Sequence, residues 1–441
     1  MSEPTATKTA PLPASGETFD VVVIGAGVAG AVASLLAARR GWSVLLVEKQ
    51  RLPRHKVCGG CLSFRAVQLL ERLGLADGLK QLNGESTDHL MIRSGRRHLR
   101  VDMPPGISVS RSLLDGWLTQ EAVQAGVRLC DGVTATVGAD VGADASAVES
   151  NDHEADGRFM RSERSGIDRS VFRVVELQKN AAVSFAGEMP RQLLPSVSSQ
   201  ILARVVLVCD GLGHPSVRHL PQFSAMPRQG SRIGLGARFD RTPADDWLPP
   251  GEILMAVGRG GYVGLVQTEQ GQLNLAAAVE PKLLRDGRSS RDCLAELLRS
   301  AGVPVPALLS QAHIRGTIPL TRSARRCADF RILLLGDATG YVEPFTGEGM
   351  AWAIQSAVDV VSLLSDRAHR SDWSPSLEQR WSAICRRAAR RDQTWCRMLS
   401  MILHRGWLLP TVMTTCRALP SIPQHIVRRI NLPSSVSDTW E

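Results

Sequence analysis

The sequence predicts an α/β fold in which a parallel sheet, assembled from separated stretches of the chain, is joined to an antiparallel sheet and followed by helices. Residues 20–24, 28–40 and 42–47 read as strand, helix and strand within about 30 residues, the pattern of a parallel βαβ unit. Residues 231–280 hold four short apolar runs with short connections, which indicates antiparallel strands. Helical patterns dominate from residue 349. At 441 residues, two joined domains are expected.

Composition is that of an ordinary globular protein, with 44% hydrophobic and 22% charged residues. The nine cysteines are odd in number and scattered, which indicates buried thiols in a reducing, cytoplasmic compartment. Residues 1–17 are polar and lack an apolar leader, and a disordered tail is predicted there. The apolar stretch 399–413 is interrupted by charge and proline and is too short to span a bilayer, although it could lie on a membrane surface.

The basic charge gathers at the C-terminal end of the chain. The net charge is +9, and residues 366–441 carry twelve arginines against six acidic residues. A solvated helix face is the simplest interpretation of the arginine run at 386–391, and peripheral contact with anionic lipid or with an acidic partner is the alternative. No helix-turn-helix, zinc or RNA-binding signature accompanies the charge, so nucleic acid is not expected as a partner.

A glycine motif follows the first predicted strand and opens the first predicted helix. Gly25 permits a tight turn, Gly27 lets a pyrophosphate approach the backbone, and Gly30 lets the helix lie against the strand. The helix N-terminus then faces the phosphates, and Glu48 at the end of the next strand is placed to bind ribose hydroxyls. The motif predicts a Rossmann-type dinucleotide site.

Two further motifs follow later apolar strands. Residues 332–335 lead into Gly336 and Asp337, and a carboxylate at that strand end can accept hydrogen bonds from a flavin's ribityl chain. Gly347 and Gly349 then open another helix, whose N–H groups would face the pyrimidine end of the ring. The apolar run 205–208 leads into the third motif, Cys209-Asp210-Gly211.

In this order and spacing, the three motifs resemble the geranylgeranyl reductase and class A flavin monooxygenase superfamily, over about residues 19–135 and 200–365. The resemblance implies a glutathione-reductase-like FAD-binding domain from residues 18–135, 190–225 and 326–365. The composition of residues 138–170 predicts a mobile insertion, the antiparallel strands predict a second domain at 226–325 that we expect to bind substrate, and the helical patterns predict C-terminal helices at 366–441. The residues expected to hold FAD are Gly25, Gly27, Ala29, Gly30, Glu48, Cys58, Gly59, Arg111, Asp337, Gly347, Gly349 and Met350.

The resemblance also limits which reactions of this superfamily the chain is expected to catalyse. The halogenase string Trp-x-Trp-x-Ile-Pro is absent from the sequence, and the reductase signature Tyr-x-Trp-Val-Phe-Pro is represented only by residues 261–266. The leading prediction is therefore a monooxygenase acting on a lipophilic or aromatic small molecule. A geranylgeranyl-reductase-like double-bond reductase and a non-catalytic flavin-binding or membrane-associated protein are the alternatives. No second glycine-turn βαβ unit exists, so NAD(P)H is expected to dock transiently as the reductant.

Cys58 and Cys61 form a CxxC sequence beside the predicted flavin. A zinc half-site lacks a second ligand pair, so no metal is expected. A redox dithiol would need a thiolate with a lowered pKa, and a loop that lines the flavin is the preferred interpretation. No acid–base pair stands out: Tyr341, Glu343 and Cys58 are weak catalytic candidates.

Overall fold

The structure is a computed structural model, and its described residues are 9–138, 172–180, 197–285, 287–343, 347–365, 373–404 and 408–431. The predicted insertion at 138–170 lies outside the described residues from residue 139 onward. The predicted C-terminal helical region is described over 373–404 and 408–431.

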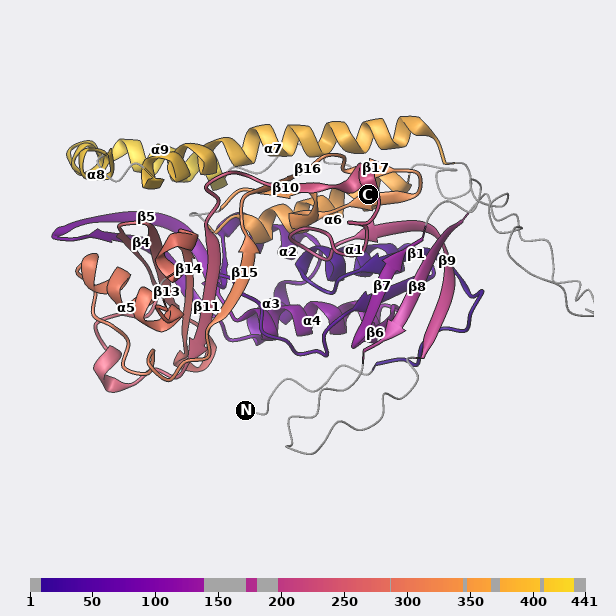
Figure 1. Cartoon of the computed structure of the whole chain (residues 1–441), viewed down its shortest axis with the longest axis horizontal. Helices are drawn as coiled ribbons and strands as arrows, with labels where there is room; N and C mark the ends of the chain where they lie inside the picture. The colour runs from indigo at the N-terminus through magenta and orange to yellow at the C-terminus, as the bar shows by residue number, and fades with distance from the viewer. Residues whose placement is uncertain are drawn as a thin grey trace, which may run out of the picture.

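The first sheet is assembled from separated stretches of the chain (Figure 1). Its parallel core has the order β18–β9–β1–β2–β6, and β17 pairs antiparallel with β18 at one edge. Along β1, Val21 and Val23 face the helices while Val22 and Ile24 face the opposite side. Burial on both faces explains why these strands are continuous apolar runs. The bounds are β1 Thr18–Ile24, β2 Val44–Glu48, β6 Arg128–Asp131, β9 Ser198–Val208, β17 Ala328–Asp329 and β18 Ile332–Leu334.

Both faces of this sheet are covered. On one face α1 (Val28–Arg39) packs against α4 (Arg111–Gln124) and α6 (Gly349–Ser365). On the other, β7 (Val133–Val137) and β8 (Arg173–Lys179) form an antiparallel ladder with the first half of β9. This arrangement leaves the carboxyl ends of the parallel strands as the open edge, where ligands bind in such folds.

The N-terminal segment corrects one expectation, because residues 9–17 are ordered where a disordered tail was predicted. The Ala10 N–H donates to the Leu129 carbonyl at 2.8 Å, and the Ser199 hydroxyl donates to the Pro13 carbonyl at 2.7 Å. These contacts use backbone groups, so the polar composition of the segment did not reveal them.

The second sheet has eight strands in the order β15–β11–β14–β13–β12–β4–β5–β3. Its centre is the antiparallel ladder predicted within residues 231–280, formed by β11 (Ile233–Phe239), β14 (Leu273–Val279), β13 (Gly261–Gln267) and β12 (Glu252–Gly258). Helix α5 (Ser290–Ser300) packs on one face of this ladder. The remaining strands are β3 Cys61–Leu62, β4 Glu85–Ser94, β5 Arg97–Ser108 and β15 Arg315–Pro319.

Strands β4 and β5 correct the predicted domain boundary. Residues 18–135 were assigned to the first domain as one block, but β4 pairs parallel with β12 and continues the second sheet. β4 is largely half-exposed, and β5 carries exposed polar residues between its buried ones, so neither has the apolar run of a buried strand. The two strands pair with each other, but β12, which joins β4 to the second sheet, lies far along the chain, where no local pattern can reveal it.

The last helices form a layer along one side of the molecule (Figure 1). Trp381 anchors α7, since its buried indole N–H donates to the Leu334 carbonyl at 3.1 Å. Helices α8 and α9 contact β5. Within the described ranges, no helix is long and apolar enough to cross a membrane. The remaining elements are α2 Phe64–Arg72, α3 Ala76–Gln81, α7 Pro375–His404, α8 Leu408–Ala418, α9 Ser421–Asn431, and the small sheet β10 Ala225–Pro227, β16 Arg322–Ala324 and β19 Gly340–Tyr341.

Candidate functional site

The glycine turn between β1 and α1 needs glycine at two of its positions for steric reasons. Gly25 has a φ of +104°, and a Cβ there would lie 2.5 Å from the Cys209 carbonyl oxygen. A Cβ on Gly30 would lie 1.9 Å from the carbonyl oxygen of Gly25. Gly27 is the N-cap of α1 and supplies no side-chain cap, so N–H groups of the first turn stay available to an anion.

Three cationic side chains converge on this turn. From the position that a Cβ on Gly27 would occupy, Arg111 Nη2 is 3.5 Å away, Arg54 Nη2 3.8 Å and Lys56 Nζ 3.9 Å. Burial and the neighbouring Arg111 both lower the pKa of the Lys56 ammonium, which Asp337 opposes. A ring of cations around the free N–H groups of a helix fits the pyrophosphate of a dinucleotide.

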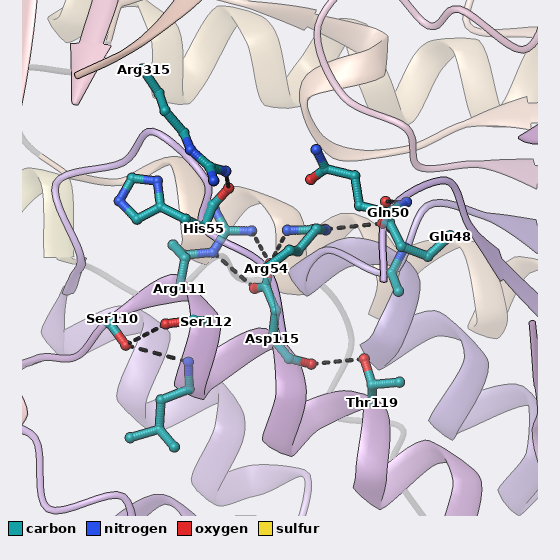
Figure 2. A network of polar contacts seen from close by, with 12 residues as sticks. Glu48, Gln50, Arg54, His55, Ser110, Arg111, Ser112, Asp115, Thr119 and Arg315 are labelled. Atoms are coloured by element: carbon teal, nitrogen blue, oxygen red, sulfur yellow. Dashed lines mark hydrogen bonds and ion pairs between the residues drawn. The ribbon is translucent and has the colours of Figure 1, made fainter. Parts of the chain in front are cut away.

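Buried carboxylates hold two of these cations, Arg54 and Arg111, in place (Figure 2). Asp115 accepts two hydrogen bonds from Arg111, at 2.8 and 2.9 Å, and a third from Arg54 at 2.9 Å. Burial disfavours the charged carboxylate, but Arg111 and then Arg54 hold the pKa of Asp115 below its ordinary value. Arg54 also donates to Glu48 Oε2 at 3.1 Å, so one network joins the start of α4 to the end of β2.

Backbone N–H groups of the glycine turn and of the residues after β2 orient the Glu48 carboxylate. Its Oε2 accepts from the Ala26 N–H at 3.0 Å, and its Oε1 accepts from the Gln50 N–H at 3.1 Å. The side chain is buried at the carboxyl end of β2. These bonds place a fixed carboxylate beside the glycine turn, as a ribose-binding residue requires.

One cavity of about 780 Å³ runs from this turn to the second sheet. Its middle is lined by Asp337, which follows β18, and by Gly349, which begins α6. Of the residues predicted to hold FAD, Gly30 alone is missing from the lining, since it lies beneath the turn against Gly25. The motifs, distant in sequence, therefore meet at one site.

Arg54 and Asp115 belong to the site but were not predicted from the sequence. A signal for Asp115 exists, because it stands four residues after Arg111 on the same helix, the spacing of an ion pair. Arg54 lies in a loop without regular structure, and no pattern in the sequence indicates which carboxylates it meets.

The CxxC loop lines the same cavity, and both thiols are free. Asn274 of β14 donates to the Cys58 carbonyl at 2.9 Å, which ties the loop to the second sheet. Burial, and then the neighbouring Cys58, raise the pKa of the Cys61 thiol to about 12. A thiol with this pKa stays protonated at neutral pH, which counts against a thiolate relay. Among the described residues, no group of three or more candidate ligands could hold a metal ion.

A polar cluster stands at the wall of the cavity, which Tyr262, Tyr341 and Glu343 line. Arg232 donates to Glu343 Oε1 at 3.0 Å, and the two side chains are 1% and 2% exposed. Burial, and then the adjacent Glu343 carboxylate to which it hydrogen-bonds, raise the pKa of the Tyr262 phenol well above its ordinary value. The Arg232 guanidinium lies 5.7 Å from the centre of the Tyr262 ring. Tyr341, the neighbouring candidate, also lines the cavity.

Tyr262 is a residue that sequence reasoning did not assign to the site. The signal was its match to the tyrosine that begins the reductase signature, within residues 261–266. At the signature's tryptophan position stands Gly264, and a Cβ there would lie 3.0 Å from Met255 Sδ. Methionine and backbone therefore fill space beside the position that an aromatic ring would take.

Comparisons with known proteins agree with this geometry. A model of a family described as FAD binding domain matches residues 18–391. The chain is 26% identical over 395 residues to the menaquinone reductase of Mycolicibacterium smegmatis, covering 84% of this chain and 83% of that protein. It is 24% identical over 382 residues to digeranylgeranylglycerophospholipid reductase 2 of Methanopyrus kandleri, covering 82% and 81%. The solved geranylgeranyl bacteriochlorophyll reductase-like protein from Thermoplasma acidophilum superposes with a TM-score of 0.65 at 16% identity, covering 88% of each chain.

Proposed function

The chain belongs to the FAD binding domain family and is an FAD-dependent oxidoreductase, and from this premise we propose that it reduces carbon–carbon double bonds of a lipophilic substrate that carries an isoprenoid chain. The observation that carries the proposal is the continuity of the cavity, which joins the cofactor cradle to a mostly apolar wall. Curated relatives that align over most of both chains are named as reductases of an isoprenoid quinone and of an isoprenoid lipid.

The cofactor end of the site is built to hold a dinucleotide. Arg54, Lys56 and Arg111 would bind the pyrophosphate together with the N-terminus of α1, and Glu48 would bind the ribose. Asp337 would accept hydrogen bonds from the ribityl chain, and the N-terminus of α6 would stabilise negative charge at the pyrimidine end. Bound FAD would supply two-electron chemistry, taking electrons from a reductant and delivering a hydride to the substrate.

The substrate end is the second sheet, which we propose as the substrate domain. Met255, Ala278 and Leu320 give the cavity an apolar wall that suits a hydrocarbon chain. Tyr262 hydrogen-bonds to Glu343 on that wall, and its raised pKa keeps the phenol protonated and uncharged across the physiological range. NAD(P)H is the proposed reductant, docking transiently.

Hydroxylation of a lipophilic or aromatic molecule is the second candidate. The observation that favours it is Gly264, which stands where the reductase signature has tryptophan. Without the tryptophan ring, the cavity wall at Gly264 differs from that of the reductases with the full signature.

One experiment separates the two reactions. The holoprotein would be incubated with menaquinone and NADPH, first under nitrogen and then in air, and the extracted lipid analysed by mass spectrometry. We expect the lipid to gain pairs of hydrogen atoms without oxygen. A product heavier by one oxygen atom, formed only in air, would support the hydroxylase and contradict the reductase. Unchanged lipid in the presence of fully reduced protein would contradict the proposed reaction on this lipid class.

A further inference from the structure

The outer side of helices α8 and α9 carries apolar and basic side chains together. Residues 417–422, which run from the end of α8 into the start of α9, are all exposed. Within them Leu419 is 53% exposed and Ile422 38% exposed, and Arg417 begins the segment. Isolated exposed apolar residues need no explanation, but two beside a turn and flanked by arginines form a patch of mixed character.

Helix α9 continues this patch. Pro423, Ile426 and Val427 are half-buried, at the spacing of one helical face. Arg428 and Arg429 are exposed on the opposite side, and helical spacing places Arg429 on the side of Ile422, two turns away. We call the set Arg417, Leu419, Ile422, Arg428 and Arg429 the α8–α9 face.

The charge of this face is not neutralised by any ion pair among the described residues. Residues 408–431 contain three arginines and no aspartate or glutamate. None of the three forms an ion pair with any residue in the described ranges. Neighbouring α7 adds two more exposed apolar side chains one turn apart, Met398 and Met401, which are 36% and 48% exposed.

The buried side of the same helices belongs to the cavity. Leu409 and Met413 of α8 pack in one cluster with Met255 and Tyr262 of the second sheet. Val427 of α9 lines the cavity itself, directly before the exposed Arg428. In Figure 1 the two helices lie at one end of the α7 layer, close to β4 and β5. A single helix layer therefore separates the cavity from the outside.

We propose that the α8–α9 face docks on an anionic lipid bilayer. Exposed arginines that form no ion pair in the described part of the chain match the negative surface potential of such a bilayer, and the exposed leucine and isoleucine can enter its interfacial region. The docking does not depend on the reaction. Docking would also give a lipophilic substrate a short route from the bilayer into the cavity. This last point rests on the proposed function.

The test is sedimentation of the purified holoprotein with vesicles, which requires no turnover. Vesicles of phosphatidylcholine alone would be compared with vesicles that also contain phosphatidylglycerol, at low and at high salt. We expect binding to the anionic vesicles and loss of that binding at high salt. Arg428→Gln with Arg429→Gln should weaken the partition coefficient about 30-fold, since each arginine near an anionic surface contributes to binding. FAD content reports that the variants remain folded.

A matched control is available within the chain. Arg325 and Arg326 are also adjacent, exposed arginines, but they lie between β16 and β17, so Arg325→Gln with Arg326→Gln should bind vesicles like the unaltered protein. Likewise, Leu419→Ser with Ile422→Ser should weaken binding, whereas Met226→Ser, at a residue 71% exposed on β10, should not.

Absence of binding to anionic vesicles would overturn the proposal, and so would equal losses in the test and control pairs. Such a result would point to an acidic protein partner, or to a solvated helix face, and would leave the proposed reductase activity standing. Conversely, vesicle binding without reduction of any lipid would sustain the docking surface and count against the reaction.

Discussion

Arg232 and Glu343 form an ion pair at 3.0 Å in which both side chains are almost completely buried. Arg232 directly precedes β11 of the second sheet, and Glu343 follows β19 beside the FAD site. The pair therefore couples the two halves of the molecule at the cavity wall. Its desolvation is costly, which makes the pair a poor source of stability but a sensitive point when one partner is removed.

Breaking this pair on one side should destabilise the protein strongly. We expect Arg232→Met to lower the free energy of unfolding by about 3–5 kcal/mol, because Glu343 would remain as an uncompensated buried charge. Adding Glu343→Leu should recover most of the loss. Urea unfolding of the two variants measures the effect. The exposed pair Arg241–Asp246 is the control, and its removal should cost about 1 kcal/mol or less. Equal losses from both pairs would contradict the role of burial.

Gly27 and Gly30 should fail in different ways when they are replaced. A Cβ on Gly27 meets only the ends of flexible arginine and lysine side chains, so Gly27→Val should fold but exclude the pyrophosphate and purify without FAD. A Cβ on Gly30 would meet a backbone carbonyl at 1.9 Å, so Gly30→Ala should lower thermal stability as well. Acid extraction with chromatography identifies the cofactor, which we expect to be one FAD per chain and not FMN. If the Gly27→Val protein retained FAD, the proposed pyrophosphate site at the N-terminus of α1 would be contradicted.

The contribution of Asp115 to stability should disappear in acid. Its pKa in the folded protein lies below the ordinary value, so the stabilisation is present above the unfolded pKa of about 3.9. It is lost as the pH falls through the lower folded value, where the folded carboxylate also takes up a proton. The difference in unfolding free energy between the unaltered protein and Asp115→Asn should therefore be largest at neutral pH and shrink toward acid. A difference independent of pH would show that the effect is steric.

Cys61→Gly should leave turnover within a few-fold. The Cys61 pKa of about 12 means that the thiol carries little negative charge at neutral pH and cannot readily attack a disulfide. Thiol titration of the denatured protein, before and after reduction, should give the same count. A large rate defect together with two missing thiols in the oxidised protein would establish a dithiol relay instead.

Local rules explain why much of the fold and of the cofactor site could be predicted. The strand, glycine turn and helix at Gly25 each obey short-range steric and hydrogen-bonding preferences, and Glu48 and Asp337 stand at strand ends that the apolar runs reveal. Strands β4 and β5 escaped prediction because neither is an apolar run and because β12, which joins β4 to the second sheet, is distant in the chain. Residues 9–17 escaped it because their contacts, through backbone groups and through the ion pair of Glu17 with Arg128, reach residues far along the chain.

The sequence by itself determined the cofactor class and the elements that hold the cofactor. A glycine turn between an apolar strand and a helix is typical of dinucleotide binding. Only the tertiary structure decided which side chains meet in the cavity. Arg54 reaches Asp115, 61 residues away in the chain, and Arg232 reaches Glu343, 111 residues away, and no periodicity encodes such contacts. Such pairs depend on how sheets and helices pack, and packing depends on contacts summed over the whole chain.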